Sequence, residues 1–180
     1  MEKYSPNKIK RVAVIGPEST GKSQLCADLA KLYSTEWIEE YARVYLSNIN
    51  RPYIISDIVA IYTRQFEQEE EKLKSANNFL FVDTEFIIAK VWSEHVFHES
   101  PEFFENMIHT HPYDFYLLTY PDLPWEFDPL RENPGKGEFF FEWYRKILIE
   151  NNLPFSIVSG FGEERLSNAV RSLQDHFKEI

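Results

Sequence analysis

A segment near the start of the chain matches the phosphate-binding loop pattern G-x-x-x-x-G-K-S. Its members are Gly16, Pro17, Glu18, Ser19, Thr20, Gly21, Lys22 and Ser23. An apolar run, residues 12–15, precedes it, and a segment with leucines at helical spacing follows, which is the strand–loop–helix context that this motif requires. A glycine-containing turn that matches by chance would not account for the strand, the Lys-Ser pair and the helix together. The motif therefore predicts a nucleotide-binding α/β protein.

The chemistry of this loop depends on its backbone and on two side chains. Glycines let the backbone turn sharply and bring N–H groups to phosphate oxygens, and the next helix directs its positive end at the same anion. Lys22 can reach the β- and γ-phosphates, and the Ser23 hydroxyl can ligate Mg²⁺. We expect residues 16–23 and Gln24 to bind ATP, with Lys22 acting in catalysis.

Composition excludes several classes of protein. The chain has 180 residues and a formal net charge of −10, which argues against a nucleic-acid partner because no basic cluster offsets that field. Cys26 is the only cysteine, so no internal disulfide forms, as is typical of a reducing compartment. Residues 1–6 lack the apolar core of a signal peptide, and no apolar run reaches membrane-spanning length. We expect a cytoplasmic protein without a membrane partner; its oligomeric state stays open.

Strand and helix patterns alternate along the whole chain. Apolar runs predict strands at residues 10–15, 36–38, 79–84, 114–119 and 155–159. Helical spacing predicts helices at residues 23–33, 39–47, 56–75, 86–98, 101–109, 137–150 and 163–177, with Ser56 as the N-cap of the long third helix. This order is typical of a parallel sheet with helices on both faces. We expect a single domain over residues 1–180.

Asp83 ends the second strong apolar strand. Proteins with a phosphate-binding loop place a carboxylate near Mg²⁺ in this way, and an acid at the end of a parallel strand faces the ligand crevice. The alternative is that Asp83 caps the next helix. Because the phosphate loop is present, we favour a functional Asp83, and we expect the nearby Glu85 to contact the phosphate acceptor.

Two further groups of residues are candidates for the site. Glu40 and Arg43 fall on one side of a predicted helix. They form either a surface ion pair or a pair that binds a ribose hydroxyl or a metal-bound water, and spacing alone favours the surface pair.

Residues 120–134 contain four prolines and predict a loop that closes over the site and excludes water. In that loop Arg131 would stabilise the transferred phosphoryl group and Trp125 would stack on a flat ring, although Trp125 could also anchor the loop and Arg131 could be solvated.

Four histidines lack zinc-binding spacing, so Mg²⁺ held with the nucleotide is the expected metal.

Four motifs occur together in a fixed order. They are the phosphate loop, Glu40-Tyr41-Ala42-Arg43, Asp83-Thr84-Glu85-Phe86, and Pro124-Trp125-x-x-Asp128-x-x-Arg131. The set resembles the ribosylnicotinamide kinase domain of NadR-type proteins, a phosphate-loop family grouped with AAA-like ATPases. The resemblance extends from about Arg11 to the last helix.

This resemblance implies ATP-dependent phosphorylation of nicotinamide riboside to nicotinamide mononucleotide. It places Ser23 and Asp83 on Mg²⁺, with Asp83 also orienting the hydroxyl, and Arg131 in the closing loop. It places Ser159 and Gly160 near the adenine. It assigns to the acceptor pocket Glu40, Tyr41, Arg43, Gln65, Glu85, Trp125 and Asp128.

The chain departs from the family pattern in the closing loop. Pro129 follows Asp128 where glycine is usual, which makes the loop stiffer. Lys136 would have to substitute for a further basic residue of the family, and lysine is a less specific oxyanion partner than arginine. Glu85 stands where aspartate is frequent. The chain starts almost at its first strand, so we expect it to lack the adenylyltransferase domain of bifunctional relatives and to make only the mononucleotide. The alternatives are a nucleotide-dependent switch without kinase activity and a kinase for another nucleoside.

Overall fold

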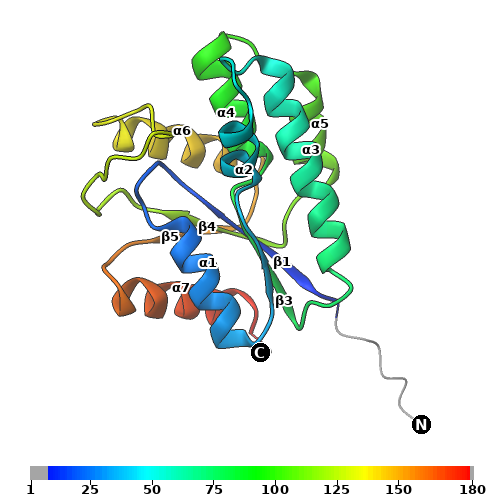
Figure 1. The fold of residues 1–180 in the computed structure, drawn as a ribbon. Helices are drawn as coiled ribbons and strands as arrows, with labels where there is room; N and C mark the ends of the chain where they lie inside the picture. The colour runs from blue at the N-terminus through cyan, green and yellow to red at the C-terminus, as the bar shows by residue number, and fades with distance from the viewer. Residues whose placement is uncertain (1–7, 179–180) are drawn as a thin grey trace.

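The computed structural model describes residues 8–178. The first six residues, which the sequence analysis describes as free of a signal-peptide core, lie outside this range. Strands and helices alternate along the described chain, as the hydrophobic pattern predicts (Figure 1). Among the described residues, no helix combines the length and the apolar character needed to span a bilayer.

Five parallel strands form one sheet in the order β2-β3-β1-β4-β5. Their bounds are β1 Lys10–Ile15, β2 Glu36–Ile38, β3 Phe79–Asp83, β4 Phe115–Thr119 and β5 Phe155–Val158. In the register, Val14 lies opposite Asp83 and Ile15 lies opposite Leu118. The carboxyl ends of the three central strands therefore meet at one edge, where ligands of open α/β sheets bind.

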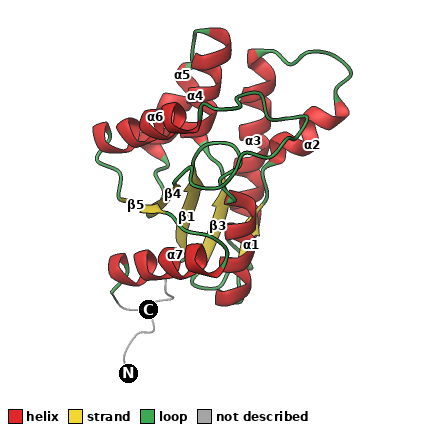
Figure 2. Ribbon diagram, turned by 90° about the vertical axis from the view of Figure 1, so that its left-hand side faces the viewer, coloured by secondary structure: helices red, strands yellow, loops and turns green. Residues whose placement is uncertain are grey.

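Helices cover both faces of this sheet (Figures 1 and 2). Their bounds are α1 Lys22–Tyr33, α2 Tyr41–Asn48, α3 Ile55–Lys72, α4 Phe86–Phe97, α5 Glu102–Thr110, α6 Gly137–Glu150 and α7 Glu163–His176. Alternation along β1 divides the core: Val12 and Val14 pack with α1 and α7, whereas Ala13 and Ile15 pack with the remaining helices. Strands buried on both faces explain the continuous apolar runs in the sequence.

The start of the long helix differs from the sequence-based prediction. Ser56 is not the N-cap, because α3 begins at Ile55 and Ile54 occupies the cap position. The carboxylate of Asp57 accepts a hydrogen bond from the backbone N–H of Ile54 at 2.8 Å. An acid in the first turn therefore accepts from the N–H of the cap residue itself, as the acid of a capping box does.

Residues 120–136, here called the lid loop, connect β4 to α6 without helix or strand structure. Figure 1 draws this segment as the yellow-green loop beside α6. Because β4 ends at the same edge of the sheet as β1 and β3, the lid loop starts beside the phosphate loop. This places it where a closing element is needed.

Candidate active site

The phosphate loop joins β1 to α1 at the carboxyl edge of the sheet. Gly16 has φ +146°, and a Cβ there would lie 2.2 Å from the Thr119 hydroxyl oxygen, so only glycine fits. The Thr20 hydroxyl donates to the Pro17 carbonyl at 2.8 Å and lies 2.6 Å from the Thr119 hydroxyl. These contacts fix the loop against β4.

Lys22 begins α1 and directs its amine back over the loop. Its Nζ donates to the Pro17 carbonyl at 2.8 Å. A lysine held across the loop in this way lies where phosphate oxygens would meet both its charge and the helix N-terminus.

Asp83 lies at the buried end of β3 and faces the phosphate loop. The Ser23 hydroxyl donates to one of its carboxylate oxygens, and the other oxygen has no hydrogen-bond partner among the described residues. Burial first, and then the negative charge of Glu40, raise the pKa of Asp83 to about 7, against the opposing effect of Lys22. A buried oxygen without a partner is costly, so this geometry leaves one position for a ligand or metal ion.

An open cavity, here called the phosphate cavity, lies over this loop. It brings together Ser23 and most of the charged residues that were selected from the sequence: Lys22, Glu40, Arg43, Asp83, Asp128 and Arg131. The lysine and the arginines suit the oxygens of a polyphosphate, whereas the carboxylates and Ser23 suit a hard cation.

Arg43 joins α2 to the lid loop. Its guanidinium donates to Asp128 at 2.8 Å and lies 3.5 Å from Glu40. The Glu40–Arg43 pair expected on a helix surface therefore exists, but Arg43 also holds the lid loop. Its hydrogen bond lowers the pKa of Asp128 and keeps that carboxyl ionised.

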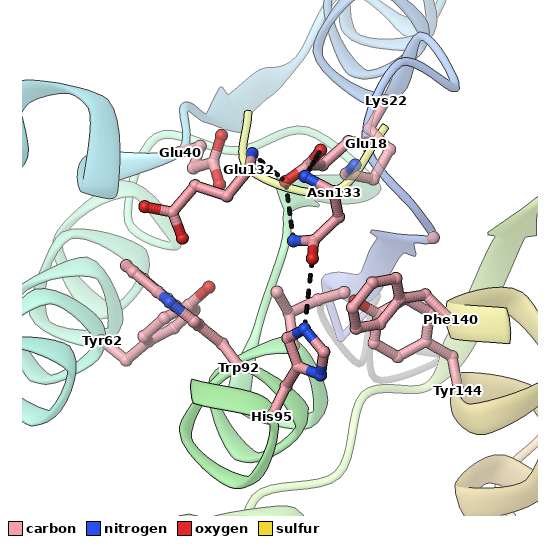
Figure 3. Close-up of a pocket in the computed structure, with 12 residues that line it drawn as sticks. Glu18, Lys22, Glu40, Tyr62, Trp92, His95, Glu132, Asn133, Phe140 and Tyr144 are labelled. Atoms are coloured by element: carbon pink, nitrogen blue, oxygen red, sulfur yellow. Dashed lines mark hydrogen bonds between the residues drawn. The ribbon is translucent and has the colours of Figure 1, made fainter. Parts of the chain in front are cut away.

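A second cavity, here called the aromatic cavity, opens beside the phosphate cavity (Figure 3). Rings from three helices line it: Tyr62 of α3, Trp92 of α4, and Phe140 and Tyr144 of α6. Acidic and polar groups at its rim are Glu18, Glu40, Glu132, His95 and Asn133. Glu18, Lys22 and Glu40 line both cavities, so a ligand in one lies next to a ligand in the other.

Four predicted acceptor residues line neither cavity: Tyr41, Gln65, Glu85 and Trp125. Gln65 is buried and donates to the carbonyls of Asp83 at 3.2 Å and Thr84 at 2.9 Å, while its amide oxygen accepts from the backbone N–H of Tyr41 at 3.0 Å. Glu85 caps α4 by accepting from the N–H of Ile87, and burial raises its pKa to about 8. Tyr41 lines a separate groove between α2 and α3. Gln65 therefore connects the backbone at the end of β3 to the start of α2.

The remaining predicted residues lie at the edges of the site. Trp125 lies in the lid loop with 37% of its surface exposed, beside the ring of Phe127, and lines neither cavity. The backbone N–H of Gly160 donates to Asp122 of the lid loop, and the carbonyl of Ser159 accepts from Asn168 of α7. Gln24 lines the phosphate cavity and an adjoining groove.

Sequence reasoning missed the walls of the aromatic cavity. Phe140 and Tyr144 recur at i, i+4 on α6, and Tyr62 and Trp92 fall within helical patterns. That spacing identifies one helix face, but it does not distinguish a face that fills the core from a face that lines a cavity. It also missed Asn133, since a single amide in a loop carries no spacing signal.

Comparisons with known proteins agree with this architecture. The family model of the AAA domain matches residues 11–165. The trifunctional NAD biosynthesis/regulator proteins NadR of Salmonella typhimurium and Escherichia coli are each 28% identical over 163 residues, which is 84% of this chain and 40% of theirs. This chain therefore spans less than half the length of these curated relatives. The similarity confirms the resemblance inferred from the motifs.

Solved structures show the same fold. A NadR protein in complex with NR matches with a TM-score of 0.80 and 21% identity, covering 96% of this chain and 51% of that one. A NadR complex with NAD and AMP-PNP gives 0.79 and 22% identity, with the same coverage. Deoxyadenosine kinase from M. mycoides gives 0.60 and 13% identity, covering 92% of this chain and 99% of that one. The chain thus has the fold of phosphate-loop nucleoside kinases, which confirms the predicted fold class.

Proposed function

Because this chain belongs to the AAA domain family, which its residues 11–165 match, we propose that it is a small-molecule kinase. It transfers the γ-phosphoryl group of ATP to the ribose 5′-hydroxyl of nicotinamide riboside. The observation that carries this proposal is the junction of the phosphate cavity with the aromatic cavity at Lys22 and Glu40. A kinase needs two adjoining sites of this kind, one for the phosphoryl donor and one for the acceptor.

The composition of the aromatic cavity supports a flat, positively charged acceptor. Aromatic rings offer stacking faces for a planar base, and their faces attract cations. Glu40 and Glu132 add negative charge at the rim. Nicotinamide riboside carries a permanent positive charge on its pyridinium ring, whereas ordinary nucleosides are neutral. The curated NadR relatives and the NR-bound structure support the same acceptor.

The residues around Asp83 fit a magnesium ion. Mg²⁺ prefers oxygen ligands and commonly takes one or two from the protein, and Asp83 presents a carboxylate oxygen without a partner next to the Ser23 hydroxyl. When bound with ATP, the ion would neutralise charge on the phosphates.

The chain's own groups supply the remaining chemistry. Lys22 would bind the β- and γ-phosphates, and Arg131 would approach from the lid loop. The ribose hydroxyl oxygen would attack the γ-phosphorus, the bond to the β–γ bridging oxygen would break, and ADP would leave. Asp83 would orient that hydroxyl and accept its proton.

Ligand-induced stabilisation tests the two-site assignment. The melting temperature would be measured with Mg²⁺ and AMP-PNP, with nicotinamide riboside, with both, and with adenosine, deoxyadenosine or uridine in place of the riboside. We expect stabilisation by AMP-PNP and by nicotinamide riboside, and little by the neutral nucleosides, because a ligand stabilises the fold that binds it. Stabilisation by AMP-PNP alone would favour the switch, and preference for a neutral nucleoside would favour a different kinase.

A further inference from the structure

Glu18 is an acid within a loop that binds anions. The third position of the phosphate loop faces the phosphate cavity, where a free carboxylate would repel a polyphosphate. Its oxygens instead accept hydrogen bonds from the lid loop. The backbone N–H groups of Glu132 and Asn133 donate at 3.1 Å each, and the Asn133 side-chain amide donates at 3.3 Å. Two successive N–H groups that share one carboxylate form a small anion-binding site.

Asn133 continues this contact into the aromatic cavity. Its amide oxygen lies 3.2 Å from Nε2 of His95. Because the amide nitrogen donates to Glu18, the amide oxygen is the acceptor in this shorter contact with Nε2 of His95, which also lies 3.5 Å from Nζ of Lys136 in the lid loop. The His95 ring packs edge-on against Phe140, with centroids 4.9 Å apart. Figure 3 shows Glu18, Asn133 and His95 as one connected chain from the phosphate loop to the cavity wall.

We propose that Asn133 is a positioning residue that holds the lid loop closed over both cavities at once. Glu18 is its anchor in the phosphate loop and His95 is its anchor in the aromatic cavity. Arg131 precedes Asn133 by two residues and lines the phosphate cavity, where its guanidinium donates to the Glu126 carbonyl at 2.7 Å. Closure of this segment therefore keeps the arginine at the cavity. The kinetic consequence rests on the proposed function, but the closure itself does not.

The part of the lid loop before Arg131 makes separate contacts with the rest of the site. Asp128 pairs with Arg43, and Glu126 exchanges hydrogen bonds with Ser19. These contacts do not involve Asn133, so they persist when its side chain is removed. The backbone N–H groups of Glu132 and Asn133 also keep their bonds to Glu18. Loss of the Asn133 amide should therefore loosen residues 131–136, raising the population of the open segment, and leave the rest of the fold intact.

Trypsin reports this release directly, because Arg131 and Lys136 flank Asn133. We expect cleavage after these two residues to accelerate about tenfold in Asn133→Ala, since proteolysis follows the population of the open segment and the variant loses two side-chain hydrogen bonds. Asn106→Ala, at an exposed position of α5, is the matched control and should be cleaved at the wild-type rate. His95→Phe keeps the ring against Phe140 but removes Nε2, so it should show part of the effect.

Two outcomes decide the proposal. Faster cleavage at Arg131 and Lys136 in Asn133→Ala, with a melting temperature within about 3 °C of wild type, supports the closure. Equal cleavage in wild type and Asn133→Ala overturns it, whatever the kinetics show.

A kinetic measurement separates this proposal from the proposed function. With Mg·ATP, an open lid admits water, which attacks the γ-phosphorus and yields ADP and phosphate. The ratio of riboside-independent ADP release to nicotinamide mononucleotide formation should rise in Asn133→Ala and stay at the wild-type value in Asn106→Ala. If wild type forms no mononucleotide, the proposed function fails while the cleavage result still judges the closure.

Discussion

The Ser23 hydroxyl donates to one oxygen of the Asp83 carboxylate, and within residues 8–178 the other oxygen has no hydrogen-bond partner. The last residue of the phosphate loop therefore meets the last residue of β3 at one point. Burial of this carboxyl beside Glu40 raises its pKa to about 7. A buried carboxyl group with a raised pKa lowers the stability of the fold and is typical of a functional site.

Replacing Asp83 with asparagine should separate these two effects. We expect Asp83→Asn to lose at least about a hundredfold in phosphoryl transfer, since proton acceptance is lost, while AMP-PNP still binds. A rate near that of wild type would remove Asp83 from the mechanism.

The same substitution should stabilise the unliganded protein, by an amount that depends on pH. The folded-state pKa of Asp83 lies above the ordinary value of 3.8, so the folded chain binds more protons and its stability falls as pH rises from about 4 to 7. Asp83→Asn removes this loss. The gain in unfolding free energy, measured with urea, should be larger at pH 8 than at pH 5. An equal gain at both values would contradict the raised pKa.

Glu40 should control the pH dependence of the reaction. If Asp83 must be ionised, kcat/KM rises as pH increases through about 7. Glu40→Gln removes a negative charge that raises the Asp83 pKa, so the acid limb of the pH profile should move to lower pH. The control is Glu67→Gln, which removes an exposed charge on α3 instead. An acid limb that stays in place in Glu40→Gln would show that another group titrates there.

Lys22→Ala should abolish turnover. The amine that now bonds to the Pro17 carbonyl would bind the transferred phosphoryl group when ATP is present. The coupled release of ADP measures this loss. Undiminished activity would refute the assignment of the phosphate loop.

Trp92 should contribute to acceptor binding rather than nucleotide binding. It lines the aromatic cavity and its Nε1 donates to the Tyr53 hydroxyl at 3.1 Å. We expect Trp92→Leu to raise the KM for nicotinamide riboside at least about tenfold, with the KM for ATP nearly unchanged. Trp143 of α6 packs against the ring of Phe139 and does not line the cavity, so Trp143→Leu is the matched control. Equal effects in both variants would indicate a change in folding instead.

The sequence was sufficient to predict the order of strands and helices and the place of the phosphate loop. Both depend on local signals: buried parallel strands give continuous apolar runs, and the loop needs glycines at fixed positions. The prediction of Ser56 as the N-cap of α3 was wrong. Ser56 and Asp57 are both suitable capping residues, and only the folded chain shows that Asp57 accepts from the N–H of Ile54.

The acceptor side was harder to predict, for a physical reason. Gln65 was assigned to the acceptor pocket through the resemblance and Trp125 through the fourth motif. Gln65 instead donates to backbone carbonyls, and Trp125 is partly exposed and lines neither cavity. The rings of Trp92 and Tyr144 come from different helices, and the cavity between them exists only after these helices pack on the sheet. Side chains that converge from distant segments leave no pattern in the sequence.

The most direct test of the proposed function is to identify the product. The protein would be incubated with Mg·ATP and nicotinamide riboside, and the mixture analysed by mass spectrometry, with Lys22→Ala as the control. We predict nicotinamide mononucleotide and ADP in equal amounts with wild type and neither with the variant. ADP without the mononucleotide, or no reaction while both ligands bind, would contradict the assignment as a nicotinamide riboside kinase.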